Sequence, residues 1–370
     1  MMNSHKQLFY HLRLFLPFLL LSGQIMGIQA DTTNKLFVFG DSFVDGGNTP
    51  KDGSIGRVIS SYSGSALAPA VPLSDAWKEP YGKTFPGEPA GRFSDGRVLS
   101  NYIAMHLGLP SPPVPYESRN DVPSDDLKNG INFAYGGTGL NDTIVPLPNM
   151  TVQINFFEKL VEENVYNVID LSNSMAMLSS FGNDYLYFLS TGGTVWNVRP
   201  FTRKLVDQMT TNLIRVQRLG VKKIAVTSVP PFGCIPVLSA QLPYSCLFDL
   251  IFNPVSTFHN NLLKEAVTTL NQVTTDGTTF LFLDLYESFL SVISNPSANN
   301  ITNVNSGCCV GVSKDYSCGN VDENNEPKYT VCENPESTLF WDSVHPSHVG
   351  WQAVYNNLEK GELGRGRLQF

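Results

Sequence analysis

The sequence predicts an α/β fold with a parallel sheet that is flanked by helices and interrupted by long loop insertions. Strand-like runs alternate with segments of helical period along the chain, which is the pattern of a doubly wound α/β protein. Residues 223–229 and 280–285 are almost continuously apolar, as expected for strands that are buried on both faces of a parallel sheet.

The remaining elements follow from periodicity and from stop signals. Further strands are expected at 35–39, 131–134 and 175–180, and helices at 98–107, 205–219, 258–270 and 349–358. The clearest helix, 205–219, stops before Gly220, a residue that often terminates helices. Its apolar residues recur on one stripe: Leu205, Met209, Leu213, Val216 and Leu219.

Three segments lack such periodicity. Residues 49–96 and 109–125 are rich in Gly, Pro and Ser, which predicts long surface loops. Residues 291–337 hold four of the six cysteines, so we expect an irregular excursion tied down by disulfides and not a second domain. Residues 31–370 are therefore expected to form a single domain, since about 340 residues can bury one large core.

The first 30 residues have the layout of a secretory signal peptide. Lys6 and Arg13 precede the apolar run 14–21, and a polar stretch of small residues ends at Ala30. The apolar run is too short to span a bilayer, which disfavours the alternative of an N-terminal membrane anchor. We expect a secreted, extracellular protein without an integral membrane segment after removal of the signal.

The charge of the expected mature chain argues against two classes of partner. Without residues 1–30 it carries 23 Lys+Arg against 33 Asp+Glu, a net charge of −10. Nucleic acid and anionic membrane surfaces attract basic proteins, so neither is the expected main partner.

Cysteines and sequons agree with an oxidising compartment. The six cysteines permit up to three disulfides, whose pairing the sequence does not reveal, although adjacent Cys308 and Cys309 are not expected to pair with each other. A zinc site is disfavoured because no C-x-x-C pair occurs. Three N-x-[ST] sequons mark expected glycosylation sites at Asn141, Asn149 and Asn300.

A serine stands at the end of the first expected strand. In the stretch VFGDSFVDGGN, residues 38–48, Ser42 follows Gly40 on a turn punctuated by glycines. Either it is an ordinary turn serine, or the turn presents its hydroxyl for chemistry. A serine hydroxyl becomes a good nucleophile only when a base takes its proton and a third group orients that base.

The search for that base leads to the stretch FWDSVHPSHVGW, residues 340–351. Asp342 lies three residues before His345, so its carboxylate can accept the Nδ1–H and leave Nε2 for the serine. His348 lacks a carboxylate at that spacing and is the weaker base. Of the remaining histidines, His5 and His11 leave with the signal peptide, whereas His106 and His259 lie in helix-like stretches and are expected to be structural.

Two further stretches could stabilise a developing oxyanion. Residues 132–139 offer backbone N–H groups at Gly136 and Gly137, and residues 179–185 offer the side-chain amide of Asn183. Taken alone, each is an ordinary turn. Both follow expected strands, however, and the carboxyl ends of parallel strands converge on the edge where α/β proteins bind ligands.

At this point the sequence resembles the GDSL esterases/lipases of the SGNH hydrolase superfamily, and in particular their large secreted plant branch. The naming block is present as Gly40-Asp41-Ser42-Phe43, with Phe43 where leucine is commonest. Further blocks follow in the family's order at 91–99, 132–139, 181–184, 229–236, 307–309 and 340–346. Two departures, SHVGW at 347–351 and VDGGN in place of VDVGN, bear on the subgroup more than on activity.

The resemblance implies a flavodoxin-like sheet of about five parallel strands and a site without cofactor or metal. It implies Ser42 as nucleophile with Asp342 and His345 as partners. It also implies an oxyanion hole formed by the Ser42 N–H, a glycine and Asn183, where Gly137 is favoured and Gly136 stays open. The pattern G-x-S-x-G is absent, which tells against the α/β-hydrolase fold but not against triad chemistry.

The expected function is a serine esterase or lipase that acts through an acyl-enzyme. Two alternatives stay open: an acyltransferase with the same triad, and a secreted binding or accessory protein that is catalytically silent. The substrate is expected to be a small-molecule or polymer-borne ester, with lipid esters, acetylated polysaccharides and phenolic esters all possible. The sequence gives no indication of oligomeric state.

Overall fold

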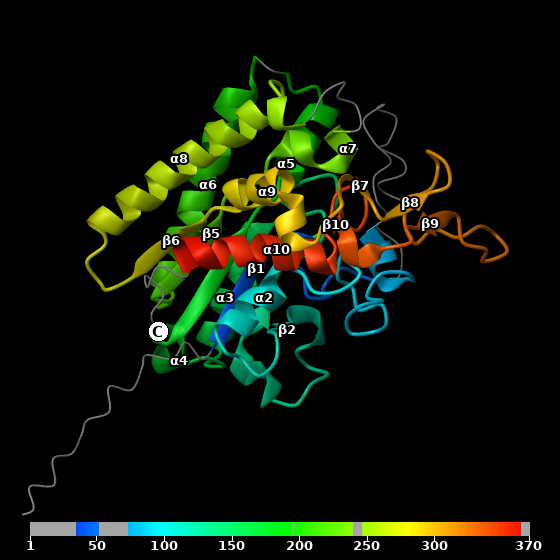
Figure 1. Cartoon of the computed structure of the whole chain (residues 1–370). Helices are drawn as coiled ribbons and strands as arrows, with labels where there is room; N and C mark the ends of the chain where they lie inside the picture. Colours follow the sequence, from blue (N-terminus) through cyan, green and yellow to red (C-terminus); the bar gives the residue numbers. More distant parts are fainter. Residues whose placement is uncertain (1–34, 52–72, 195, 240–245, 364–370) are drawn as a thin grey trace, which may run out of the picture. The chain divides into compact units, whose positions relative to one another are not determined.

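A computed structural model describes residues 35–51, 73–194, 196–239 and 246–363, all of which belong to one unit, Asp31–Phe370. Its centre is a six-stranded sheet with the strand order β2-β3-β1-β4-β5-β6, in which every pairing is parallel (Figure 1). The predicted α/β class is therefore confirmed. The predicted signal peptide, residues 1–30, lies outside the described residues.

All five predicted strands are present, most of them somewhat shorter than expected. They are β1 (Lys35–Gly40), β3 (Ile131–Asn132), β4 (Ser174–Ser179), β5 (Lys223–Thr227) and β6 (Thr279–Leu283). The sixth strand, β2 (Val114–Pro115), lies within 109–125, which was predicted to be a loop. Two residues are too few to show periodicity, and β2 exists only because it pairs with β3.

The four predicted helices are also confirmed. They are α2 (Leu99–His106), α6 (Val198–Arg218), α8 (Asn253–Val273) and α10 (His348–Leu358). Helix α8 begins five residues earlier than expected, with Pro254 in its first turn. Proline is accepted there because the first N–H groups of a helix have no intrahelical acceptor.

Several helices of the structure were not predicted from the sequence, and α3 (Met150–Glu162) is the longest of them. Its first half is rich in Thr, Val, Ile, Asn and Phe, which have low helix propensity. The side chain of Asn149 caps its start by accepting the Val152 N–H at 3.1 Å. The others are α4 (Val168–Ser172), α5 (Asn183–Ser190), α7 (Pro236–Ser239) and α9 (Leu285–Ser294).

Alternate residues of β1, β4, β5 and β6 pack into two separate cores. In β1, Leu36 and Val38 point into a core that is covered by α2, α9 and α10. Phe37 and Phe39 point to the opposite face, where α3, α6 and α8 pack. Both faces of the sheet are covered, so the sheet is the middle of three layers and the interior positions of its longer strands are mostly apolar.

Short strands and disulfides organise the excursion at 291–337. Strand β7 (Asn303–Gly307) pairs with β10 (Thr338–Phe340), and β8 (Cys309–Gly311) pairs with β9 (Tyr329–Val331). The disulfides are Cys234–Cys246, Cys308–Cys332 and Cys309–Cys318, so the adjacent cysteines do have different partners.

The described residues contain no group of three or more His, Cys, Asp or Glu side chains placed to hold a metal ion. None of the helices among them is long and apolar enough to cross a membrane.

His259, expected to be structural, is buried in α8 with its Nδ1 atom 2.9 Å from the Tyr185 hydroxyl. Burial disfavours the charged imidazolium and lowers the pKa of His259 from 6.5 to about 4. An unfolded chain therefore binds one more proton than the folded protein between these pH values. The contribution of His259 to the free energy of unfolding is therefore complete above pH 6.5 and is lost as the pH falls toward 4.

We predict that the free energy of unfolding of the wild type falls, relative to His259→Asn, by up to about 3 kcal/mol between pH 6.5 and pH 4. The variant loses packing at every pH but lacks the titrating group. Urea unfolding of both proteins across this range measures the difference. A difference that is independent of pH would contradict the buried, neutral state of His259.

Candidate active site

Ser42 lies on a tight turn directly after β1. The Val44 and Asp45 N–H groups both donate to the Asp41 carbonyl, at 3.1 and 2.9 Å, which closes the turn around Ser42. Gly40 makes this exit possible with φ of +153°, and a Cβ at that position would collide with the Ser179 carbonyl oxygen. The local sequence thus turns the chain sharply at the carboxyl edge of the sheet.

Gln153 of helix α3 holds the start of this turn in place. The Gln153 Nε2 atom donates to the Gly40 carbonyl at 2.9 Å, and its Oε1 atom accepts the Gly40 N–H at 2.8 Å. Both polar groups of Gly40 are therefore held by one buried side chain. The sequence did not reveal this role, because Gln153 belongs to a helix without a clear helical pattern.

The structure brings Ser42, His345 and Asp342 into one hydrogen-bonded chain. His345 Nε2 lies 2.8 Å from Ser42 Oγ, and His345 Nδ1 lies 2.8 Å from Asp342 Oδ2. All three side chains are buried. This is the geometry in which an imidazole takes a serine proton while a carboxylate orients the ring.

Asp342 and His345 lie on a short loop between β10 and α10. The Trp341 N–H donates to the His345 carbonyl at 2.7 Å, and the Asp342 Oδ1 atom accepts the N–H groups of Val344 and His345 at 2.7 and 2.8 Å. Burial by itself would raise the pKa of Asp342, but His345 and these N–H donors outweigh it and hold the pKa below its usual value. Asp342 is therefore a stable carboxylate.

Tyr81 is a further partner of this carboxylate, and the sequence analysis did not identify it. Its buried hydroxyl donates to Asp342 Oδ2 at 2.8 Å. Burial and the neighbouring Asp342 charge raise the pKa of Tyr81 well above its usual value, so the phenol keeps its proton. Trp341 and the cysteines of two disulfides pack around the ring, which fixes the hydroxyl.

The two glycines left open by the sequence differ in the structure. The Gly136 N–H donates to Thr49 Oγ1 at 2.8 Å and to Asp45 Oδ2 at 3.1 Å. In contrast, the N–H groups of Gly137 and Ser42 have no acceptor among the described residues. Gly137 and Ser42 therefore have donors free for a ligand, whereas Gly136 does not.

Asn183 is the first residue of α5 and lies near the same place. Its Nδ2 atom donates to the Thr138 carbonyl at 2.8 Å, which holds the amide next to Gly137. In the part of the chain that the structure describes, this bond engages only one of its two amide N–H groups. The other is available to a ligand.

Asp41, the carboxylate of the Gly-Asp-Ser block, stabilises the fold around the serine turn. Its Oδ2 atom accepts the Phe181 N–H at 2.6 Å, so it joins the serine turn to the segment after β4. Burial raises the pKa of Asp41 to about 7 in spite of the N–H donors of Phe181 and Phe43.

The other histidines face different partners. His348 Nδ1 accepts the Arg97 N–H at 3.1 Å, which places this nitrogen away from Ser42. His106 Nδ1 lies 3.1 Å from the Tyr355 hydroxyl. Neither is part of the chain of hydrogen bonds around Ser42.

The three sequons also differ in their surroundings. Asn141 and Asn300 are exposed, as glycan acceptors must be. Asn149 is half-buried, caps α3 and donates to Asp142 Oδ1 at 2.7 Å. Its amide is thus already engaged in the fold.

We predict that Tyr81→Phe lowers kcat/KM for a simple ester by about tenfold to a hundredfold, because a hydrogen bond to a buried carboxylate is worth about 1.5–3 kcal/mol. Steady-state kinetics, normalised by active-site titration, measures the effect. Tyr102→Phe is the matched control, since Tyr102 is also a buried residue but its hydroxyl donates to the His348 carbonyl instead. Equal losses in both variants would contradict the assignment of Tyr81 to Asp342.

The chain is similar to proteins of one known family. A family model described as GDSL-like Lipase/Acylhydrolase matches residues 36–358. Two GDSL esterase/lipases of Arabidopsis thaliana are 40% and 41% identical, the first covering 97% of this chain and 98% of the relative, the second 88% of each. Acetylajmalan esterase 2 of Rauvolfia serpentina is 29% identical over 91% of this chain and 92% of its own.

A solved α/β hydrolase enzyme from the metagenome of Lake Arreo aligns with 13% identity over 88% of this chain and 94% of its own. The TM-score of this alignment is 0.34.

Proposed function

We propose that this chain, which belongs to the GDSL-like lipase/acylhydrolase family, hydrolyses esters by nucleophilic catalysis through Ser42, His345 and Asp342. The chain is a carboxylic ester hydrolase. The observation that carries the proposal is the 2.8 Å hydrogen bond between His345 Nε2 and Ser42 Oγ, continued at 2.8 Å to Asp342. In serine hydrolases the nucleophile, the base and the orienting carboxylate act in this order.

In the first half-reaction, His345 Nε2 takes the Ser42 proton while Oγ attacks the ester carbonyl carbon. The carbonyl electron pair moves to oxygen, and Asp342 stabilises the imidazolium that forms. When the tetrahedral intermediate collapses, the bond to the alcohol oxygen breaks, and His345 gives its proton to that oxygen. The acyl group is then an ester of Ser42.

In the second half-reaction, water takes the place of the alcohol. His345 accepts a proton from water, the resulting hydroxide adds to the acyl carbon, and Ser42 leaves with the proton from His345. The carboxylic acid is released and the serine is restored. No cofactor or metal takes part in these steps.

The oxyanion of both intermediates would be held by the N–H groups of Ser42 and Gly137 and by the amide of Asn183. Support comes from the free N–H groups of Ser42 and Gly137 and from the hydrogen bond that fixes Asn183 beside Gly137. Donors that are already in place need no reorganisation as the negative charge develops.

Secretion is the second part of the proposal. Residues 1–30 would be removed as a signal peptide, which leaves 31–370 as a single catalytic domain. Three disulfides among the described residues support this, because disulfides persist in oxidising compartments. Exposed Asn141 and Asn300 would be open to glycosylation.

We predict that Ser42→Ala lowers the rate of p-nitrophenyl acetate hydrolysis by about 10⁴-fold or more, because the variant lacks the attacking oxygen. Release of p-nitrophenolate measures the rate. Labelling by a fluorophosphonate probe should disappear in the same variant. Persistent turnover in Ser42→Ala would overturn the proposed nucleophile.

We predict that Asn183→Ala lowers kcat by about 10²–10³-fold with a smaller change in KM, since an oxyanion donor acts mainly in the transition state. Asn167→Ala serves as the control, because Asn167 caps the distant helix α4 through its side chain. Near-normal kcat in Asn183→Ala would remove this residue from the oxyanion hole.

A further inference from the structure

We propose that Thr49 and Asp45 are positioning residues of the oxyanion hole. They hold the glycine turn, residues 135–138, so that the Gly137 N–H can reach the oxygen of the ester carbonyl. Thr143 holds the same turn from its other end. This inference rests on the proposed function, because it names residues that act through one donor of the same site.

The glycine turn contains a peptide that is free to rotate. The Thr138 N–H donates to the Tyr135 carbonyl at 3.4 Å and closes the turn, and Gly137 has φ of +76°, a conformation that favours glycine. The central peptide, which joins the two glycines, carries the Gly137 N–H. Because neither glycine has a Cβ that restricts its backbone, the direction of this N–H depends on residues outside the turn.

Thr49 anchors the peptide before the central one. Its Oγ1 atom accepts the Gly136 N–H at 2.8 Å and donates to Asp45 Oδ2 at 2.7 Å. An ionised carboxylate can only accept hydrogen bonds, so Asp45 attracts the hydroxyl hydrogen of Thr49 and leaves a lone pair of Oγ1 for Gly136. Both side chains are buried, which keeps water from competing for these bonds.

Asp45 also connects the glycine turn to the serine turn. Its Oδ1 atom accepts the N–H groups of Gly47 and Asn48, both at 2.8 Å, and its own N–H helps to close the turn around Ser42. One buried residue thus contacts both turns. The N–H groups of Ser42 and Gly137 are therefore kept in one mutual arrangement.

Thr143 anchors the peptide after the central one. Its hydroxyl donates to the Gly137 carbonyl at 2.8 Å. The central peptide thus lies between two anchored peptides, one held by Thr49 and the other by Thr143. Oxyanion donors are most effective when they are in place before the charge develops, so the loss of either anchor weakens the Gly137 N–H as a donor.

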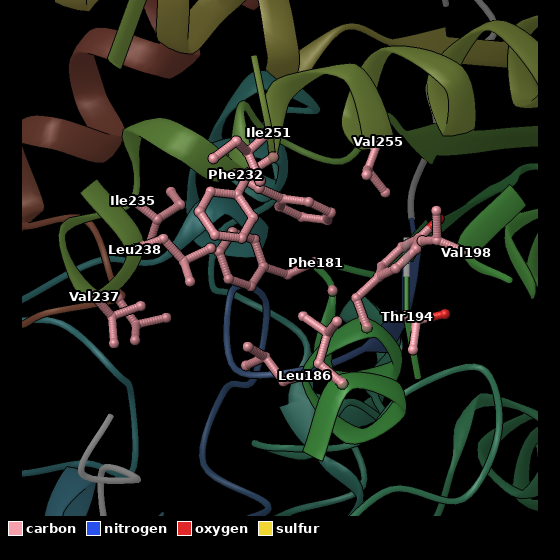
Figure 2. Close-up of a pocket in the computed structure, with 15 residues that line it drawn as sticks. Phe181, Leu186, Thr194, Val198, Phe232, Ile235, Val237, Leu238, Ile251 and Val255 are labelled. Atoms are coloured by element: carbon pink, nitrogen blue, oxygen red, sulfur yellow. The ribbon is translucent and has the colours of Figure 1, made fainter. Parts of the chain in front are cut away.

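Thr49 and Asp45 offer no binding surface to a substrate, because Thr49 is 1% exposed and Asp45 is 0% exposed. An apolar pocket between helices α5, α6, α7 and α8 adjoins Asn183 through Gly182 (Figure 2). Its lining includes neither Thr49 nor Asp45, nor any residue of the glycine turn. A substitution at Thr49 therefore leaves the lining of this pocket unchanged and acts on the rate through the glycine turn.

The test compares Thr49→Val with Thr49→Ser, using p-nitrophenyl acetate and the full chain. Thr49→Val keeps the shape of the side chain but cannot accept the Gly136 N–H, so kcat should fall by about tenfold to a hundredfold with little change in KM. Thr49→Ser keeps the hydroxyl and should retain most of the wild-type kcat. Thr202→Val is the matched control, because the hydroxyl of buried Thr202 also accepts one hydrogen bond, from Tyr185, and donates one, to Val198.

A second measurement tests the oxyanion hole itself. Phenylboronic acid adds to a serine hydroxyl and forms a charged tetrahedral adduct that resembles the intermediate. Its inhibition constant should rise in Thr49→Val by the factor by which kcat falls, and it should not change in Thr202→Val. A purely structural role of Thr49 would lower the melting temperature but leave the inhibition constant and the kcat per titrated active site unchanged.

Thr143→Val decides if Thr49→Val does not fold, because Thr143 is only half-buried and its replacement disturbs the core less. Thr143 also belongs to the sequon of Asn141, so Asn141→Gln is the control for the loss of a glycan. A lower kcat with little change in KM is expected in Thr143→Val and not in Asn141→Gln.

Two results would overturn the inference. One is a folded Thr49→Val with the kcat of the wild type. The other is an equal loss of kcat in Thr49→Val and Thr49→Ser, since the hydroxyl would then be irrelevant. Either result, with an active wild type, leaves the proposed function in place. A wild type that hydrolyses no ester and does not react with a fluorophosphonate would instead refute the proposed function, and this inference with it.

Discussion

The hydrogen bond between His345 and Ser42 is the contact on which the rest of the site depends. It joins residues that are 303 positions apart, so neither local turn has this geometry without the complete fold. Strand β1 ends at the carboxyl edge of the sheet and positions the turn that carries Ser42. Strand β10 and helix α10 hold the loop that carries Asp342 and His345.

The serine turn and the loop of Asp342 and His345 are both immobilised by buried polar groups whose hydrogen bonds are satisfied. Gln153 holds Gly40 through its N–H and its carbonyl, and Tyr81 donates to Asp342. Such contacts are costly to break inside a protein, because the partner that remains is buried without water. The carboxylate and the serine turn therefore have one position each, which is what proton transfer over 2.8 Å requires.

Two environments meet at Ser42, and they suit different parts of an ester. Toward Gly137 and Asn183 the surroundings offer N–H donors, which suit a carbonyl oxygen that gains negative charge. Toward Phe181 and Val344 they offer apolar side chains. The boundary between the two environments runs through the segment 181–183, where one chain turn contributes to both.

The sequence by itself determined the features that depend on neighbouring residues. Buried strands are visible in the sequence as apolar runs. The Asp342–His345 pair is local as well, because residues three positions apart on one loop can bring a carboxylate to an imidazole. The prediction that Ser42 belongs with them came from chemistry, because a serine nucleophile needs a base that a third group orients, and from the resemblance to the GDSL esterases/lipases. The structure brings these three side chains within hydrogen-bond distance of one another.

Only the tertiary structure decided what depends on distant partners. Tyr81 lies 261 positions from Asp342, and the pairing of the six cysteines follows from proximity that no spacing encodes. Gly136 and Gly137 are adjacent glycines that the sequence does not distinguish. They differ in the structure because Thr49 and Asp45 accept the N–H of Gly136. The apolar pocket is likewise a product of packing, because its walls come from helices whose side chains meet only when the chain has folded.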